Sequence, residues 1–284
     1  MFSDRLRLTE VQRTERAIAE LSTVSWARPL LERLSREGGI TNENMPLMFE
    51  VRFAQELHRA GVTAEYEFRA GVGDSSVEFR LDTTPTWLIE LVSVRASDAA
   101  KRAVRQVGLI YEQLLRPTPD DPGRSEEGEM ITAEQKIGEK VFAQGQPTKF
   151  PAPDGSLRLI LTDIRGYLDQ GGGVLDYRQM AYGASGIPRE YAWIIHYWES
   201  KPGQRVPIKG LFETGNPLRA ARYVQERIHF LGFIREDDFH DGEIQETAYY
   251  LANWHLFSTE SDAIRAFETY PLTPGASTAG KANP

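Results

Sequence analysis

The sequence contains no cysteine, which excludes disulfide bonds and thiolate metal sites. It has no apolar run near the roughly 20 residues that a membrane-spanning helix requires. The first residues, 1–7, are not followed by the apolar core of a secretory signal peptide. These absences predict a protein without membrane association and with a reducing, cytoplasmic location.

An excess of basic charge is also lacking. Among 284 residues, 33 Lys and Arg stand against 41 Asp and Glu, which gives a net charge of −8 and a pI near 5.3. This balance argues against a protein that coats nucleic acid through bulk electrostatics, although a local basic groove is compatible with it. The five histidines form no pair at the spacing of zinc ligands, so a zinc site is not expected.

The most informative stretch covers residues 75–94. Residues 77–81 alternate apolar and polar side chains, which is the pattern of a half-buried strand. Residues 87–94 form a nearly continuous apolar run, which indicates a strand covered on both faces. Residues 82–86 between them are typical of a turn. We therefore predict a β-hairpin.

Two carboxylates face each other in this predicted hairpin. Pairing Leu81 with Trp87 places Glu78 opposite Glu90 on the same side of the sheet. Opposed carboxylates repel each other, and an unpaired charge inside an apolar strand is costly. A divalent cation bound between them would resolve both problems. The alternatives are a different register or neutralisation by an arginine of the same segment, Arg80 or Arg95.

A third acid is predicted to face the same interior. Asn44 is the expected N-cap of a helix that runs to about Ala60 and stops at Gly61. At about 100° per residue, Glu50 falls near the middle of the broad apolar face of this helix. Such a carboxylate is either paired with a buried arginine or functional.

The rest of the sequence predicts a mixture of helices and strands. We expect helices over residues 4–37, 97–115, 129–144, 217–231 and 259–270. We expect strands over residues 62–69, 157–163, 191–198 and 248–257. The polar segment 117–128 is predicted to be a loop, and residues 271–284 a disordered tail.

The order helix, three strands, helix, strand over residues 44–163 resembles the PD-(D/E)XK nuclease superfamily. The matching acids are Glu50 on the first helix, Glu78 in Val-Glu-Phe on the second strand and Glu90 in Ile-Glu-Leu-Val on the third. The lysine that the superfamily has two positions after the third acid is Val92 here.

The resemblance implies metal-dependent phosphodiester hydrolysis by a DNA or RNA endonuclease, in a bacterial defence setting. Glu78 and Glu90 would hold Mg²⁺ or Mn²⁺, and Glu50 would support the ion or its water shell. Nucleic acid is the implied partner, DNA rather than RNA, together with a homo-oligomer or a partner protein of a defence system.

Because Val92 replaces the lysine, the resemblance implies that the following helix supplies another polar group beside the acids. Gln135 and Lys136 are the candidates for this catalytic position. The helical phase favours Gln135 as the inward group and places Lys136 and Lys140 nearer to solvent.

The predicted fold class is α/β (α+β), with a restriction-endonuclease-like core over residues 41–165 that includes an inserted helix and loop at 97–128. An N-terminal helical arm (1–40) precedes this core, and a C-terminal α+β extension (166–270) follows it. The alternative function is that of a catalytically inactive nuclease-like fold that binds protein or nucleic acid. A third is that of a metal-dependent hydrolase of small phosphorylated molecules.

Overall fold

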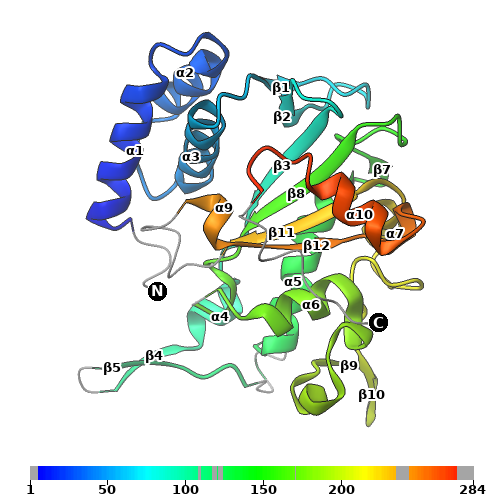
Figure 1. Ribbon diagram of the computed structural model, residues 1–284. Coiled ribbons are helices and arrows are strands. Elements are labelled where there is room, and N and C mark those ends of the chain that lie inside the picture. Colours follow the sequence, from blue (N-terminus) through cyan, green and yellow to red (C-terminus); the bar gives the residue numbers. More distant parts are fainter. Residues whose placement is uncertain are drawn as a thin grey trace.

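A computed structural model of the protein describes residues 6–107, 110–116, 120, 124–169, 171–234 and 243–273. A six-stranded sheet lies at its centre (Figure 1). In spatial order its strands are β1 (Ala64–Phe68), β2 (Val77–Leu81), β3 (Trp87–Ser93), β8 (Leu157–Asp163), β11 (Phe230–Ile234) and β12 (Ala248–Ala252). The pairs β3–β8 and β8–β11 are parallel, and the other three pairs are antiparallel. The fold is therefore a mixed α/β fold, as predicted.

One face of the sheet is covered by helices from both ends of the described chain. These helices are α1 (Leu8–Leu21), α2 (Arg28–Arg36), α3 (Met45–Arg59) and α10 (Glu260–Phe267). Their apolar side chains share one buried cluster with the sheet, including Leu21, Leu34, Phe53, Trp87 and Phe267. The segment predicted as an N-terminal arm thus packs on the core through α1 and α2.

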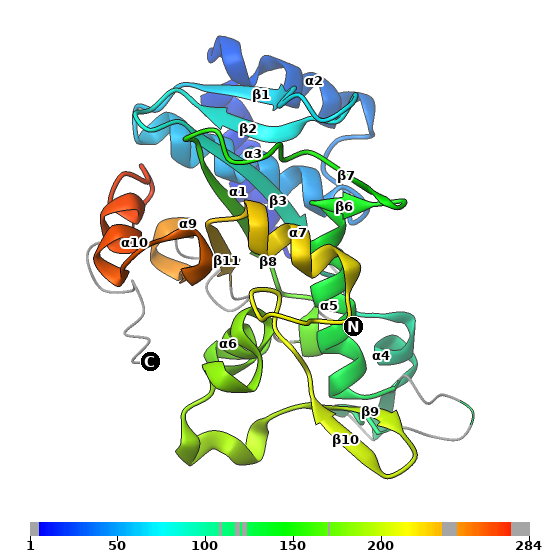
Figure 2. The same cartoon turned by 90° about the vertical axis from the view of Figure 1, so that its right-hand side faces the viewer.

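The opposite face carries α5 (Glu126–Glu139), α6 (Val174–Tyr182) and α7 (Arg219–Arg227). Figure 2 shows α5 and α6 on the side of the sheet that is remote from α2. Gly138 allows α5 and α7 to approach closely, since a Cβ added there would lie 2.7 Å from the Cβ of Ala220.

Smaller elements surround the sheet. Three two-stranded ribbons pair β4 (Val104–Val107) with β5 (Ile110–Gln113), β6 (Phe142–Ala143) with β7 (Gln146–Pro147), and β9 (Tyr197–Lys201) with β10 (Gln204–Pro207). Short helical segments are η1 (Ser25–Ala27), α4 (Asp98–Arg102), η2 (Tyr167–Asp169), η3 (Gly183–Gly186), η4 (Arg189–Ile194), α9 (Ile244–Thr247) and η5 (Trp254–Leu256). Within the described ranges, no helix is long and apolar enough to cross a membrane.

The predicted central hairpin is confirmed in its strands and in its register. Leu81 pairs with Trp87 across the β2–β3 turn. β3 lies between β2 and β8, and its residues are buried up to Val92. The helix predicted after Asn44 is confirmed as α3, which ends near Gly61, a glycine with a φ of +71°. The Asn44 side chain does not cap this helix, because it donates hydrogen bonds to backbone carbonyls of the preceding turn.

The helix predicted over residues 97–115 is wrong beyond its first turn. Ser97 caps only the short α4, accepting a hydrogen bond from the backbone N–H of Ala100. The chain then forms the β4–β5 hairpin, in which Arg105 and Glu112 make a cross-strand ion pair of 2.9 Å. Valines favour extended backbone because they are β-branched, and this preference outweighed the helical spacing of the apolar residues.

Two predictions in the C-terminal half are also wrong. Residues 191–198, predicted as a strand, begin in the helical turn η4, which ends at Ile194, and only Tyr197 and Trp198 lie in a strand, β9. Trp193 in η4 is 80% exposed. The helix predicted over 217–231 ends at Arg227, and the buried strand β11 follows. A short apolar run does not reveal by periodicity alone whether it is helix or strand. Most of the predicted disordered tail, and part of the predicted loop at 117–128, lie outside the described residues.

Candidate functional site

The two opposed glutamates lie at the end of the β2–β3 ladder. Glu90 is fully buried at 0% exposure, and Glu78 is 9% exposed. They lie one position beyond the last pair of the ladder, because Glu78 precedes Phe79 on β2 and Glu90 follows Ile89 on β3. Because side chains alternate along a strand, Glu90 lies on the sheet face that packs against α5. Its neighbours on that face belong to the apolar cluster there, namely Leu88 and Val92.

The carboxylates replace the backbone hydrogen bonds that the ladder lacks at this point. The N–H of Glu78 donates to Oε2 of Glu90 at 3.3 Å. The N–H of Leu91 donates to Oε2 of Glu78. Each side chain is therefore held by the backbone of the opposite strand, which leaves the Oε1 atoms for other partners.

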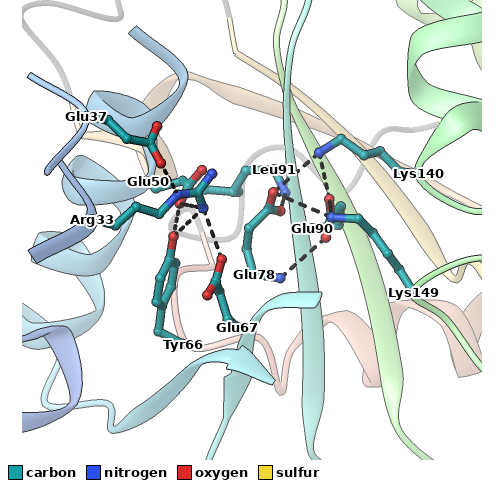
Figure 3. A network of polar contacts seen from close by, with 10 residues as sticks. All are labelled: Arg33, Glu37, Glu50, Tyr66, Glu67, Glu78, Glu90, Leu91, Lys140 and Lys149. Carbon is teal, nitrogen blue, oxygen red and sulfur yellow. Dashed lines mark hydrogen bonds and ion pairs between the residues drawn. The ribbon is translucent and has the colours of Figure 1, made fainter. Parts of the chain in front are cut away.

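Two lysines supply those partners (Figure 3). Lys140 Nζ lies 2.6 Å from Oε1 of Glu90 and 3.3 Å from Oε1 of Glu78. Lys149 Nζ contacts the same Glu90 oxygen and lies 3.8 Å from Oε1 of Glu78. Lys140 is the C-cap residue of α5, and Lys149 lies in the segment between β7 and β8. We call Glu78, Glu90, Lys140 and Lys149 the carboxylate–lysine cluster.

The electrostatics of this cluster are those of acids removed from water. Burial, and then the charge of Glu78, raise the pKa of Glu90 to about 8, although both lysines oppose this shift. Burial alone would lower the pKa of Lys140, but the carboxylates of Glu90 and Glu78 outweigh it and raise that pKa. The cluster thus contains a proton-binding acid whose ionised form depends on nearby positive charge.

Glu50 belongs to a separate polar network next to this cluster. Its Oε2 accepts a hydrogen bond of 2.6 Å from the hydroxyl of Tyr66 and lies 3.7 Å from the guanidinium of Arg33. Burial, and then the charge of Glu78, raise the pKa of Glu50 to about 7. Glu78 therefore influences both acids, and Figure 3 shows it between Glu50 and the lysines.

The helix α5 presents different side chains to the acids from those that its phase had predicted. Gln135 and Lys136 are both exposed, and no contact of either with Glu78 or Glu90 is found among the described residues. The expected inward position of Gln135 was therefore wrong. Lys140 reaches the acids instead, because α5 ends at Glu139 and the long lysine side chain extends from the C-cap.

The arginines considered as neutralising partners make other contacts. Arg80 lies 3.8 Å from Glu65 and stacks on the ring of Phe68. Arg95 donates to the backbone carbonyls of Asn42 and Glu43. Lysines from outside the hairpin, rather than arginines within it, neutralise the acids.

Lys149 had no signal in the sequence that would have selected it. It follows the β6–β7 ribbon, and its backbone N–H donates to the hydroxyl of Ser75 at 2.8 Å. This bond ties the segment before β8 to the start of the hairpin.

A metal ion can be tested against the donor atoms present. Within the described ranges, no group of three or more histidine, aspartate or glutamate side chains is arranged to hold a metal. Glu50 is thus not a third ligand beside Glu78 and Glu90. The Oε1 atoms of Glu78 and Glu90 nevertheless converge on one position, which Lys140 Nζ occupies. Two carboxylates fit Mg²⁺, which keeps several waters and takes other ligands from substrate phosphates.

Comparison with known proteins adds nothing to this geometry. No protein-family model, no curated protein and no solved structure matches the chain. Function must therefore be inferred from the fold and the carboxylate–lysine cluster.

Proposed function

We propose that this protein is a Mg²⁺-dependent endonuclease of the PD-(D/E)XK type that cleaves phosphodiester bonds in nucleic acid, with DNA favoured over RNA. The observation that carries the proposal is the sharing of Lys140 by Glu78 and Glu90 on adjacent strands, with Lys149 in contact with the same glutamate. Paired carboxylates can hold the metal ion of metal-assisted phosphodiester hydrolysis, and lysines beside them can stabilise the charge that develops on the phosphate.

The chain order around the cluster supports the proposal. Helix α3, strands β1 to β3, helix α5 and strand β8 come in this order, with α4 and the β4–β5 ribbon before α5 and the β6–β7 ribbon after it. β8 lies parallel to β3. This is the order that the resemblance implies for a restriction-endonuclease-like core. Val92, where the resemblance implies a lysine, is 4% exposed and packs in the apolar cluster. Lys140 and Lys149 bring positive charge to the acids from other parts of the chain.

In the proposed mechanism, Glu78 and Glu90 would hold Mg²⁺, which supplies positive charge and a bound water of lowered pKa. Ionised Glu90 is needed for this role, and a bound cation favours the ionised form. Lys140 and Lys149 would donate hydrogen bonds to the non-bridging phosphate oxygens. In the hydrolysis, a water oxygen would bond to phosphorus as the bond to the leaving oxygen breaks, with a proton of the water passing to the solvent and the leaving oxygen taking up a proton from the solvent. The lysine ammonium groups would stabilise the negative charge that develops.

Glu50 would have a supporting role in this arrangement. It lies in the adjacent network with Tyr66 and Arg33, and it interacts electrostatically with Glu78. Its charge therefore affects how strongly Glu78 attracts a cation. It would tune cation binding without contacting the ion.

One observation favours a second candidate, an inactive nuclease-like module that binds protein or nucleic acid. The two lysines already neutralise the two acids, so the cluster is complete as a buried ion-pair network. In this alternative the four residues stabilise the junction between β2, β3 and α5 without performing chemistry.

Cleavage of supercoiled plasmid and of single-stranded DNA and RNA distinguishes the two candidates. The proposal predicts that the wild type cleaves at least one of these in Mg²⁺ or Mn²⁺, and that chelation stops the reaction. Glu90→Gln and Lys140→Met should each lower the rate by about 100-fold or more, as expected for residues at the reacting centre. Glu139→Gln, an exposed acid next to Lys140, should cleave as the wild type does.

The inactive module is supported if the wild type cleaves none of the three substrates with either metal. Cleavage that survives in Glu90→Gln would also sink the proposal, since it would place the activity elsewhere or in a contaminant. Thermal melting of each variant shows whether a lost activity reflects a lost fold.

A further inference from the structure

A cavity of about 670 Å³ lies beside α5, which contributes Ile131, Glu134 and Gln135 to its lining. It is enclosed by α5, by the β9–β10 ribbon and by the segment that leads to α7, and Figure 2 shows these elements on the same side of the sheet. Small-molecule sites typically have volumes of about 300–1,000 Å³ and mostly apolar walls. The walls here are of that kind, and include Ile131, Ala184, Trp198, Val206, Ile208 and Leu218.

One buried acid stands in this apolar wall. Glu134 is only 1% exposed, and its Oε1 has no hydrogen-bond partner among the described residues. A buried oxygen without a partner loses the hydrogen bonds that water would make, so it is rare in folded proteins. A ligand that donates a hydrogen bond inside the cavity would provide the missing partner.

The groups around Glu134 indicate the charge of such a ligand. Burial raises the pKa of Glu134 well above its ordinary value, the side chain of Asn216 opposes this shift, and the charge of Glu213 adds to it. Lys209 also lines the cavity, but it lies 3.6 Å from Glu213 and donates to the carbonyl of Thr214. Glu213 is thus paired with this lysine, whereas no ion pair of Glu134 is found in the described part of the chain. Beside Glu134 a cation is therefore favoured over an anion.

We propose that this cavity binds a small organic amine, with the nitrogen donating to Glu134 and the apolar body lying against Trp198 and Leu218. Trp198 is 51% exposed, so part of its ring is available at the mouth of the site. An aromatic face attracts cations as well as apolar groups. The inference is independent of phosphodiester cleavage, because it involves neither acid of the carboxylate–lysine cluster.

Binding has a consequence for protons. An ammonium group that pairs with Glu134 stabilises the carboxylate, so amine binding lowers the pKa of Glu134, which burial raises. The amine stays protonated, and any proton that Glu134 carries in the free protein passes to the solvent. Up to one proton is therefore released for each amine bound at neutral pH.

Isothermal titration calorimetry with three matched probes tests the proposal. Phenylbutylamine, phenylbutanol and phenylbutyrate share an apolar body and differ in the charge of the head group. The wild type should bind the amine with a Kd on the order of 1 mM or tighter, as expected for a ligand of this size. The alcohol should bind more weakly, and the acid should not bind. Titrations in buffers of different ionisation enthalpy should show proton release with the amine alone.

Two pairs of variants locate the site. Glu134→Gln keeps the shape of the side chain. It should weaken amine binding by roughly 10-fold or more, as expected when a hydrogen bond to a charged group is lost. It should also abolish proton release. Glu139→Gln, an exposed acid on the same helix outside the cavity, should change neither. Trp198→Ala should weaken binding of both amine and alcohol, whereas Trp193→Ala, outside the cavity and 80% exposed, should not.

The proposal is overturned if the wild type does not bind the amine, or if it binds the amine and the acid equally well. It is also overturned if Glu134→Gln binds the amine with unchanged affinity. Because glutamine is close in size and uncharged, this variant should fold, and its thermal melting curve provides the check.

Discussion

The substitution Glu90→Gln gives the sharpest test of the electrostatics of the carboxylate–lysine cluster. Burial raises the pKa of Glu90 to about 8 in the folded protein, from an ordinary value of 4.5. An acid whose pKa is raised by folding binds more protons in the folded state than in the unfolded state. The stability of the wild type should therefore fall as the pH rises from 4.5 to about 8. Glutamine cannot titrate, so the variant lacks this part of the pH dependence.

The expected size follows from the shift in pKa. A change from 4.5 to about 8, at 1.36 kcal/mol per unit, corresponds to about 5 kcal/mol as an upper bound. The free energy of unfolding of Glu90→Gln, relative to that of the wild type, should increase by up to that amount from the acid to the alkaline end of this window, because only the wild type loses stability. Urea denaturation followed by tryptophan fluorescence, repeated across the pH range, measures it.

The control is Glu139→Gln, which removes an exposed acid next to Lys140 and leaves Glu90 in place, so the pH dependence that Glu90 gives the wild type should remain. The reasoning is refuted if the difference between Glu90→Gln and the wild type does not change with pH. That result would mean that Lys140 and Lys149 keep Glu90 ionised at every pH tested.

Three further predictions concern neighbouring residues. The free energy of unfolding of Glu50→Gln, relative to that of the wild type, should also increase with pH, but over a narrower range, because the pKa of Glu50 is raised only to about 7. The upper bound of this increase is about 3 kcal/mol, and urea denaturation across the pH range measures it. Tyr66→Phe removes the 2.6 Å hydrogen bond to Glu50 and should lower the free energy of unfolding by about 1–2 kcal/mol, and an unchanged urea midpoint would contradict this. Gly138→Leu should lower the free energy of unfolding by about 1–3 kcal/mol, because the new Cβ would lie 2.7 Å from the Cβ of Ala220. Ala220→Gly should recover part of this loss of stability, which a double-mutant cycle measures.

The hairpin could be predicted from the sequence because its determinants are local. The alternating strand, the turn and the apolar run lie within 20 consecutive residues, and the pairing of Leu81 with Trp87 follows from them. The opposition of Glu78 and Glu90 follows from that register. Glu50 was predicted to face the interior from the phase of α3 alone, and it is 5% exposed.

The cations of the site could not be predicted, because each reaches it from a distant part of the chain. Lys140 lies 50 residues from Glu90 and Lys149 lies 59 residues from it. The helical phase of α5 does not apply to a long side chain that extends from its C-cap. Lys149 is positioned by a ribbon of only two residues per strand and by its bond to Ser75.

The strand β11 shows a different limit of sequence reasoning. Its five residues are all buried between β8 and β12, so neither face shows the alternation that identifies a half-buried strand. The apolar run merged with the preceding helix in the sequence pattern. The same holds for the cavity beside Glu134, because its walls come from segments whose proximity only the tertiary structure establishes.

The central claim is that Glu78 and Glu90 form a cation site which a divalent ion can enter in place of Lys140. Calorimetric titration of the protein with Mn²⁺, without nucleic acid, tests it most directly. The account predicts one ion per chain, binding that tightens as the pH rises toward about 8, and loss of binding in Glu90→Gln. No binding by the wild type, or equal binding by the variant, would contradict it.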